Sequence, residues 1–267
     1  MPRNAKRTFA AWPLPSPLLP EPRSFAPSGF DLANNNCLQT GVADVSWEAS
    51  RNWVGAAGGY RLGQEAISPL GRFAKRILDL LVSSIAILFL WPLMLAIAIA
   101  VKLESRGPAI YASLRVGKGG VPFVCYKFRT MVPGANGLRR HLRHLNQRRG
   151  PFFKIANDPR ITPFGRFLRK YSLDELPQLW NVLRGEMSLV GPRPHPLEDC
   201  AEYSSYHCRR LGVKPGIAGL WQILARTNPS FDICMMLDLS YIEAWSLMLD
   251  CEILMRSIPA VLAGEGQ

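Results

Sequence analysis

Two adjacent acids, Asp174 and Glu175, lie in the stretch SLDELPQLWN, inside the most basic part of the chain. Residues 127–226 hold 18 Lys and Arg against 7 Asp and Glu, which leaves a local net charge of +11. Two ionised carboxylates this close repel each other unless a cation intervenes, so an arginine or Mg²⁺ is implied. A carboxylate nucleophile, a metal-binding acid and cations around phosphates are the parts that phosphoryl transfer requires.

A purely structural role competes with this interpretation. Ser172 and Glu175 have the spacing of a capping box, in which Ser172 caps a helix and Glu175 reaches back to its amide. Pro177 favours the first turn of a helix and disfavours a helical Leu176. Both interpretations place the acids in the turn at a helix start, and the acid pair alone favours the cap.

Several basic side chains lie in or beside predicted turns, where binding sites are commonly built. Arg193 lies between two prolines, which leave its backbone little freedom to lose on binding. Arg166 and Arg169 are three residues apart on a predicted helix and share a face of it. The remaining members of the set are Lys127, Arg129, Lys214 and Arg226.

Local patterns predict the elements that carry these residues. Two β-branched and aromatic runs flank GKGG, which indicates a β-hairpin with Lys127 and Arg129 on its second strand. The run GLRRHLRHLNQRRG predicts a polar basic helix. The next helix begins with Thr162 as N-cap and Pro163 at its first position, and a further short helix, after the acids, ends near Gly185.

The segment from Leu80 to Val101 is 22 residues without a charge. A straight helix of that length, at about 1.5 Å per residue, would cross a hydrocarbon layer of about 30 Å. Pro92 predicts a kink near its middle. Basic residues flank both ends and draw both toward the cytoplasm, as a re-entrant hairpin-like helix allows, whereas kinked spanning helices are also common. The two topologies stay open on the residues alone. The flanking residues are Arg72, Lys75, Arg76, Lys102, Arg106, Arg115 and Lys118.

The two ends of the chain have different compositions. Residues 1–68 are rich in Pro, Gly and Asn and predict a disordered cytoplasmic tail without a secretory signal. The six cysteines show no Cys-x-x-Cys pair and predict free thiols. Residues 229–267 predict partly amphipathic helix, with Met235, Leu239, Ile242 and Leu249 near helical spacing; they belong either to the core or to a membrane interface.

From Arg72 to Ala263 the sequence resembles the bacterial sugar transferases, the monotopic phosphoglycosyl transferases of surface polysaccharide synthesis. The resemblance rests on KFRTM, DPRITPFGRFLRKYSLDELPQLWNVLRGEMSLVGPRP, KPGIAGLWQ and WSLMLD, in that order and at similar spacing. It implies a re-entrant membrane helix broken at Pro92. The chain departs from the family at Trp91, where Ser often precedes the proline, and at Ala218 and Ala225, where Thr and Gly are usual.

The resemblance also implies the chemistry. Asp174 matches the family's nucleophile, which takes a hexose-1-phosphate from a UDP-sugar, releases UMP and passes the phosphosugar to undecaprenyl phosphate. Glu175, with Asp174, matches the Mg²⁺-binding acids. The basic residues expected near phosphates are Lys127, Arg129, Arg169, Arg193 and Arg226.

These inferences combine into one expected architecture. We expect a helix-dominated mixed α/β, monotopic protein of the bacterial cytoplasmic membrane, with its active site facing the cytoplasm and membrane lipids as partners. Its parts are a tail (1–68), the re-entrant helix (69–103), a catalytic domain with a small β-hairpin (104–228) and an interfacial helical segment (229–267). The alternative is a membrane-anchored basic protein that binds acidic lipid or nucleic acid. Few aromatic residues interrupt the run from Arg139 to Arg149, so we expect no nucleic-acid partner.

Overall fold

The computed structural model describes residues 68–138, 141–147, 153, 155, 157–225 and 230–264. The predicted tail, apart from Ser68, and Arg226 lie outside these residues. The α-helices are α2 (Pro69–Glu104), α3 (Ala135–Leu138), α4 (Pro163–Lys170), α5 (Gln178–Arg184), α6 (Leu197–Cys200), α7 (Ser205–Cys208), α8 (Leu220–Leu224), α9 (Phe231–Glu243) and α10 (Leu247–Leu262). The strands are β1 (Ile110–Val116), β2 (Pro122–Phe128), β3 (Ser188–Val190) and β4 (Gly216–Ala218). Short 3₁₀ turns are η3 (Lys118–Gly120), η4 (Arg143–Leu145), η5 (Leu173–Glu175) and η6 (Arg209–Gly212). The fold is therefore mixed α/β and dominated by helices, as predicted.

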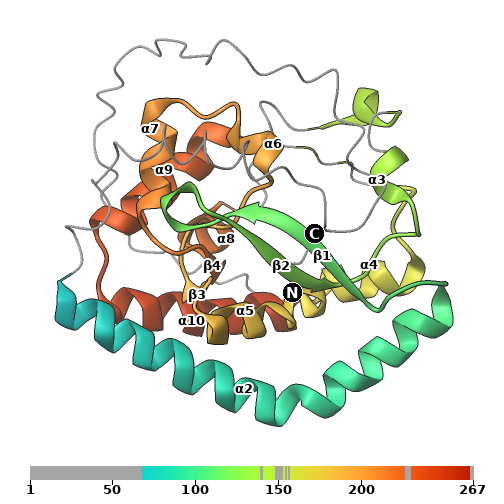
Figure 1. The fold of residues 1–267 in the computed structure, drawn as a ribbon, viewed down its shortest axis with the longest axis horizontal. Helices are drawn as coiled ribbons and strands as arrows, with labels where there is room; N and C mark the ends of the chain where they lie inside the picture. The colour runs from blue at the N-terminus through green and yellow to red at the C-terminus, as the bar shows by residue number, and fades with distance from the viewer. Residues whose placement is uncertain are drawn as a thin grey trace, which may run out of the picture.

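Helix α2 is the longest element and lies along one side of the molecule (Figure 1). It starts at Pro69, after the Ser68 hydroxyl, which accepts a hydrogen bond from the Gly71 amide at 3.1 Å. The helix continues through Pro92 and bends near its middle into a shallow V (Figure 1), as expected where a proline removes a backbone hydrogen bond. In the described part of the chain it is the one helix long and apolar enough to cross a membrane.

The N-terminal arm of α2 is fixed to the rest of the protein by charged side chains. Lys75 forms an ion pair with Asp250 of α10 at 2.6 Å. Arg76 donates to the Val182 carbonyl, at the end of α5, at 2.6 Å. Asp79 accepts hydrogen bonds from β3. Lys75 and Arg76, predicted as charges that flank a membrane segment, therefore contact the folded protein: Lys75 pairs with a carboxylate and Arg76 binds backbone carbonyls.

The C-terminal arm of α2 packs on the same body. Ile97 and Val101 are buried against β2 and α4 in one hydrophobic cluster. Beyond the helix end, the Arg129 guanidinium donates to the carbonyls of Ser105 at 2.7 Å and Arg106 at 2.6 Å. The carbonyls at a helix end have no hydrogen-bond partner within the helix. The Arg129 side chain therefore caps the C-terminal end of α2.

The predicted hairpin is confirmed. β1 and β2 are antiparallel, with Ser113 opposite Cys125 and Tyr111 opposite Lys127. The connection η3 has Gly119 at φ 67° and Gly120 at φ 80°, a left-handed backbone that suits glycine. Alternate side chains of a strand share a face, so this register places Lys127 on the same face as Cys125.

A second, parallel pair of strands, β3 and β4, was not predicted. Each strand has three residues, too few for a periodic signal in the sequence. The two backbones approach so closely that a Cβ atom on Gly216 would lie 2.1 Å from the Gly191 amide nitrogen. Glycine at 216 therefore allows β4 to support the loop that follows β3, where Arg193 lies.

The predicted basic helix over 137–150 is wrong where the structure describes it. Helix α3 ends at Leu138, and a separate 3₁₀ turn, η4, covers Arg143–Leu145. Arginines at neighbouring turns repel each other, and the run offers little apolar surface whose burial would stabilise a helix. Residues 139–140 and 148–150 lie outside the described residues.

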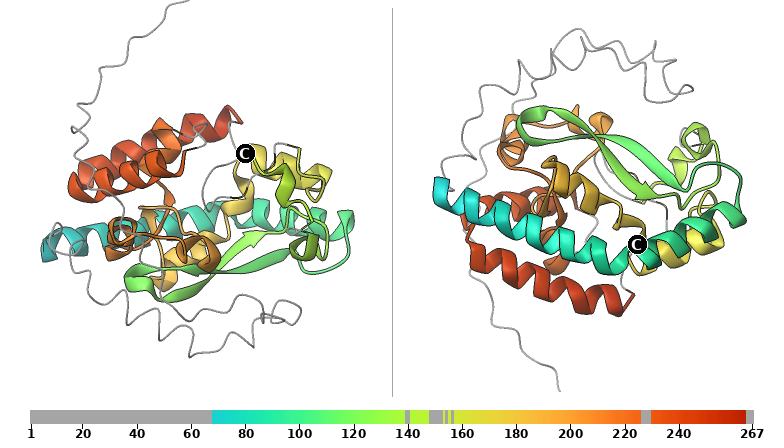
Figure 2. Two further views of the ribbon diagram at one scale, coloured as in Figure 1. Left: turned by 90° about the horizontal axis from the view of Figure 1, so that it is seen from above. Right: turned by 60° about the horizontal axis from the view of Figure 1, so that its bottom comes forward.

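The C-terminal helices belong to the core on one side and expose apolar residues on the other. The predicted core positions are buried: Met235, Leu239, Ile242 and Leu249. Helix α10 runs beside α2 (Figure 2) and exposes the large apolar side chains of Leu247, Met248, Met255, Ile258 and Leu262. Since α9 and α10 share a hydrophobic cluster with α5 and β3, residue 229 does not mark a packing boundary.

Candidate active site

The acids occupy the 3₁₀ turn η5, between α4 and α5. Ser172, just before it, has a left-handed backbone with φ 54°, and no side-chain cap hydrogen bond joins it to the turn. The predicted capping box is therefore wrong. Leu176 has helical angles (φ −53°, ψ −38°), so the predicted break before Pro177 is wrong as well. The acids do lie in the turn before α5, as both interpretations predicted.

Glu175 is held by two cations from distant segments. Its Oε1 atom lies 2.7 Å from Lys127 Nζ and 2.5 Å from Arg193 Nη2. Burial alone would raise the pKa of Glu175, but Arg193 and Lys127 lower it well below its ordinary value. Glu175 is therefore ionised at neutral pH, and the cation that the adjacent acids require is supplied by the protein itself.

Asp174 is also buried, with 8% of its surface exposed, but its environment differs. Among the described residues, no ion pair or hydrogen bond engages its carboxylate. Burial raises the pKa of Asp174, Lys127 lowers it, and the charge of Glu175 raises it; the net direction is upward. An unpaired carboxylate of raised basicity beside several cations is suited to attack a phosphorus atom.

Helix α4 brings Arg169 to this turn. As predicted, α4 begins at Pro163, and its Thr162 cap accepts from the Gly165 amide at 2.9 Å. Arg169 Nε donates to the Thr130 hydroxyl at 2.9 Å, and its charge contributes to lowering the Asp174 pKa. Arg166, predicted to share the face of Arg169, is exposed, whereas Arg169 is partly buried.

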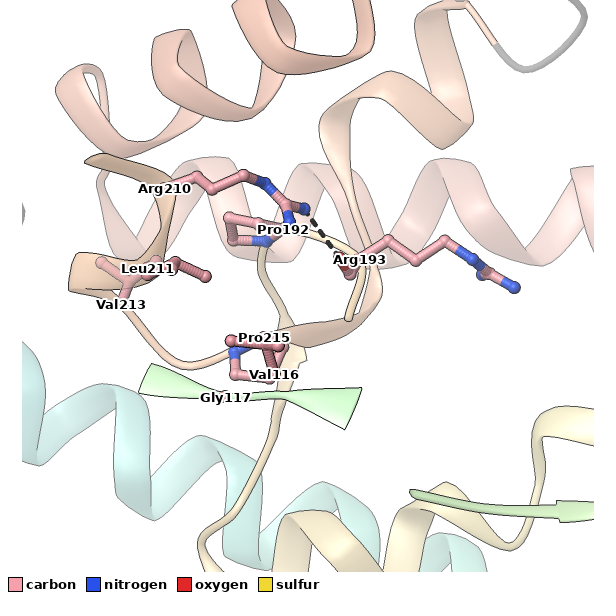
Figure 3. A pocket seen from close by; sticks show the side chains of 8 residues that line it. All are labelled: Val116, Gly117, Pro192, Arg193, Arg210, Leu211, Val213 and Pro215. Atoms are coloured by element: carbon pink, nitrogen blue, oxygen red, sulfur yellow. Dashed lines mark hydrogen bonds between the residues drawn. The ribbon is translucent and has the colours of Figure 1, made fainter. Parts of the chain in front are cut away.

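The loop after β3 carries Arg193, and it is fixed from behind by Arg210. Figure 3 shows the Arg210 guanidinium donating to the Arg193 carbonyl, at 2.7 Å, while the Arg193 side chain points the other way. Arg210 forms an ion pair with Asp238 of α9 at 2.6 Å, and both side chains are almost fully buried. It also donates to the Tyr203 hydroxyl at 2.9 Å. The sequence did not predict this support, because Arg210 and Asp238 are 28 residues apart in the chain.

The structure therefore groups some predicted site residues and separates others. Lys127 and Arg193 meet at Glu175, and Arg169 lies near enough to Asp174 to influence it. Arg129 instead binds the carbonyls at the end of α2.

The donor set can be tested against Mg²⁺. This ion is usually bound by one or two carboxylates together with substrate phosphates and water. Within the described residues, Glu175 Oε2 accepts only the longer contact from Arg193 Nη1, at 3.4 Å, and Asp174 has no ion-pair partner. The two carboxylates therefore fit a Mg²⁺ ion that shares its coordination with a phosphate ligand. Within the described residues, no group of three potential metal ligands exists, so the protein alone does not complete a cage.

A small cleft opens beside Glu175. Its lining residues are Arg115, Cys125, Lys127, Gln178, Arg193 and Pro194. Arg115 and Gln178 were missed as site residues. The hairpin register could have identified Arg115, because it lies on the β1 face that carries Ser113 and Tyr111, opposite Cys125 and Lys127.

The fold combines a long apolar helix with a pair of unequal acids and the cations around them. The sequence model of the bacterial sugar transferase family matches residues 70–264. The chain therefore belongs to the bacterial sugar transferases.

Named relatives agree with the family. The chain is 40% identical over 205 residues to the exopolysaccharide production protein ExoY of Rhizobium meliloti, covering 75% of this chain and 91% of ExoY. It is 42% identical over 199 residues to the undecaprenyl-phosphate galactose phosphotransferase of Salmonella typhimurium and to the UDP-glucose:undecaprenyl-phosphate glucose-1-phosphate transferase of Xanthomonas campestris. Those matches cover 73% and 71% of this chain but only 42% and 39% of the relatives, so the chain spans less than half of their length.

Proposed function

We propose that this protein transfers a hexose-1-phosphate from a UDP-sugar to undecaprenyl phosphate through a covalent intermediate on Asp174. The observation that carries the proposal is the unequal pairing of the two acids: Glu175 is bound by Lys127 and Arg193, whereas no described residue pairs with Asp174. The names of the relatives supply the donor and acceptor classes, and they include both galactose and glucose. The proposal therefore specifies a hexose.

In the first step, an Asp174 carboxylate oxygen attacks the phosphorus that bears the sugar. A bond forms between that oxygen and the phosphorus, and the bond from the phosphorus to the bridging oxygen of the diphosphate breaks. UMP leaves with the bonding electrons. Lys127, Arg169 and Arg193 neutralise the charge on the phosphoryl oxygens, which is the main demand of phosphoryl transfer.

In the second step, a phosphate oxygen of undecaprenyl phosphate attacks the same phosphorus. The bond to Asp174 breaks, the carboxylate is regenerated, and undecaprenyl diphosphate hexose is the product. Mg²⁺, when bound by Glu175 and Asp174 with diphosphate oxygens, would supply further positive charge to the transferring group. Glu175 stays ionised throughout, because two cations compensate it.

We also propose that α2 enters and leaves the cytoplasmic membrane on the same side. Both arms of α2 pack on one body: Lys75 pairs with Asp250, and Val101 is buried near β2 and α4. A helix that crossed the bilayer would place its ends on opposite sides and could not make both sets of contacts. The bend of α2 supports this geometry (Figure 1), and the catalytic face would then be cytoplasmic.

Exposed apolar surface supports the membrane contact. Helix α2 leaves Phe89 74% exposed and Trp91 55% exposed. Soluble proteins rarely expose large contiguous apolar patches, which mark interaction sites for membranes or partners. Together with the exposed residues of α10, which runs beside α2 (Figure 2), this surface is suited to the lipid acceptor's membrane.

The alternative of a basic binding protein has weaker support. Several arginines of the basic region are compensated inside the protein, since Arg160 pairs with Asp158, Arg193 with Glu175 and Arg210 with Asp238. The net charge of +11 for residues 127–226 already subtracts Asp158 and Glu175, and Asp238 compensates one further arginine from outside that range. These three arginines are therefore bound to acids of the protein and are not presented to an external polyanion.

Asp174→Asn tests the proposal. With a UDP-hexose and no acceptor, the wild-type protein should gain a hexose-phosphate mass on the peptide that contains Asp174 and should release UMP. The variant should do neither, and loss should exceed about 1000-fold because the nucleophile is gone. It should still fold, since the substitution removes a buried charge. If the Asp174→Asn variant still released UMP and carried the hexose-phosphate on another residue, the role of Asp174 would be contradicted.

A further inference from the structure

The cleft beside Glu175 has three cations, and one of them differs from the others. Lys127 and Arg193 are both paired with Glu175. Arg115 donates from Nε to the Ser113 hydroxyl at 3.2 Å and from Nη1 to the Pro194 carbonyl at a long 3.5 Å. No carboxylate forms an ion pair with Arg115 among the residues that the structure describes. In this part of the chain its charge is influenced by Asp199 only at longer range.

The backbone fixes Arg115 at the edge of the cleft. It lies near the end of β1, opposite Phe123 of β2, and an isolated antiparallel bridge joins it to Pro196. The hairpin and the loop that carries Arg193 therefore meet at Arg115. A guanidinium held from two sides loses little conformational entropy when it binds an anion.

A partly buried cation without an acid is electrostatically costly unless a ligand compensates it. Burial lowers the pKa of Arg115 and outweighs Cys125 and Asp199, which raise it, while the charge of Arg193 also lowers it. A guanidinium nevertheless stays charged at neutral pH. The anion that relieves this excess must reach a narrow cleft next to Asp174. A planar guanidinium binds phosphate oxygens through paired hydrogen bonds.

We propose that Arg115 binds the diphosphate of the nucleotide donor and remains with the phosphate of UMP as it leaves. This inference rests on the proposed function, because that function supplies a UDP-sugar. It gives the three cations of the cleft different tasks: Lys127 and Arg193 hold Glu175 and face the phosphoryl group in transfer, and Arg115 receives the phosphate of the departing nucleotide. Arg115 is then a substrate-binding residue that distinguishes a nucleotide from its nucleoside.

Binding of UMP and uridine to the full-length chain in detergent tests this role. Wild-type protein should bind UMP more tightly than uridine. Arg115→Met should weaken UMP binding by about 10- to 100-fold, the loss of one charge-assisted hydrogen-bonding group, and leave uridine binding unchanged. Lys118→Met, at the tip of the same hairpin, is the matched control and should bind UMP as the wild type does. If Arg115→Met does not accumulate, Arg115→Gln removes the charge but keeps a donor for Pro194.

Each outcome separates the inference from the function on which it rests. If wild type and Arg115→Met discriminate UMP from uridine equally, while UMP release from a UDP-hexose continues, Arg115 does not bind the nucleotide phosphate and the proposed function stands. Equal losses in Arg115→Met and Lys118→Met would also overturn the inference, because the effect would then be general charge. If wild-type protein binds neither ligand and releases no UMP, both proposals fail.

Discussion

Asp174 and Glu175 are adjacent in sequence, but the fold gives them opposite electrostatic environments. Glu175 reaches Lys127 on β2 and Arg193 after β3, so its charge is stabilised. Asp174 is buried without a partner among the described residues, so its charge is disfavoured. This difference is how two identical functional groups can serve as a fixed anion and a nucleophile. It depends on cations 48 and 18 residues away from Glu175 in the chain.

The pH dependence of UMP release should report this coupling. Attack requires ionised Asp174, so the rate rises as pH increases through the Asp174 pKa, which burial and the Glu175 charge hold above the ordinary aspartate value. Glu175→Gln removes that negative charge and frees Lys127 and Arg193 to act on Asp174. The acidic limb of the profile should therefore move to lower pH.

The plateau rate of Glu175→Gln should also fall, because an acid proposed to bind Mg²⁺ is lost. Glu243→Gln, an exposed residue that pairs with Arg209, is the control and should leave the limb in place. An acidic limb of Glu175→Gln that stays unchanged or moves to higher pH would show that Glu175 does not raise the Asp174 pKa.

For single residues, the sequence identified the members of the site better than it identified the residues that each of them contacts. The acid pair could be selected because two carboxylates in a basic segment require a cation. The sequence could not decide between an arginine and Mg²⁺, because Lys127 and Arg193 reach Glu175 only through tertiary packing. Arg129 shows the opposite case: near Lys127 in sequence, it has its hydrogen bonds at the end of α2.

Among the elements, α9 supports the active-site loop without touching the acids. Asp238 of α9 pairs with Arg210, which donates to the Arg193 carbonyl. Removing one partner of a buried pair leaves the other charge uncompensated. Arg210→Met should therefore lower the free energy of unfolding by about 3–5 kcal/mol.

The double variant Arg210→Met/Asp238→Leu separates stability from positioning. Its unfolding free energy should recover toward the wild-type value, because no unpaired charge remains. Its rate of UMP release should stay about 10- to 100-fold low, because the Arg193 carbonyl still lacks its donor. Denaturant unfolding in detergent and single-turnover UMP release measure the two quantities. Recovery of both together would mean that Arg210 has only a structural role.

Elements with a strong local signal were predictable, and those stabilised by distant contacts were not. Thr162 followed by Pro163 correctly marked the start of α4, and GKGG marked the hairpin turn. The three-residue strands β3 and β4 have no period to detect and exist because Gly216 lets two backbones pack closely. The prediction of one helix over the basic run 137–150 was wrong because it rested on spacing alone and ignored the repulsion among the arginines.

For the whole molecule, the contacts of α2 favour the re-entrant topology proposed above over the spanning one, which hydropathy left open. The apolar run is long enough to span a bilayer, and a sequence window cannot register where its ends are held. In the structure, Arg76 binds the end of α5 and Arg129 binds the end of α2, so one folded body holds both arms. In the proposed topology the lipid-facing part is the bent middle of α2, and α10, with its exposed apolar side chains, lies beside α2 (Figure 2).

The proposed topology places the residues before α2 on the cytoplasmic side, and Cys37, which lies outside the described residues, can test this placement. In intact bacterial cells, a membrane-impermeant maleimide should leave Cys37 unmodified, and in permeabilised cells it should modify it, with the peptide read by mass spectrometry. A reference protein with a periplasmic cysteine in the same cells shows that the reagent reaches that compartment. Modification of Cys37 in intact cells would contradict the cytoplasmic placement of the residues before α2.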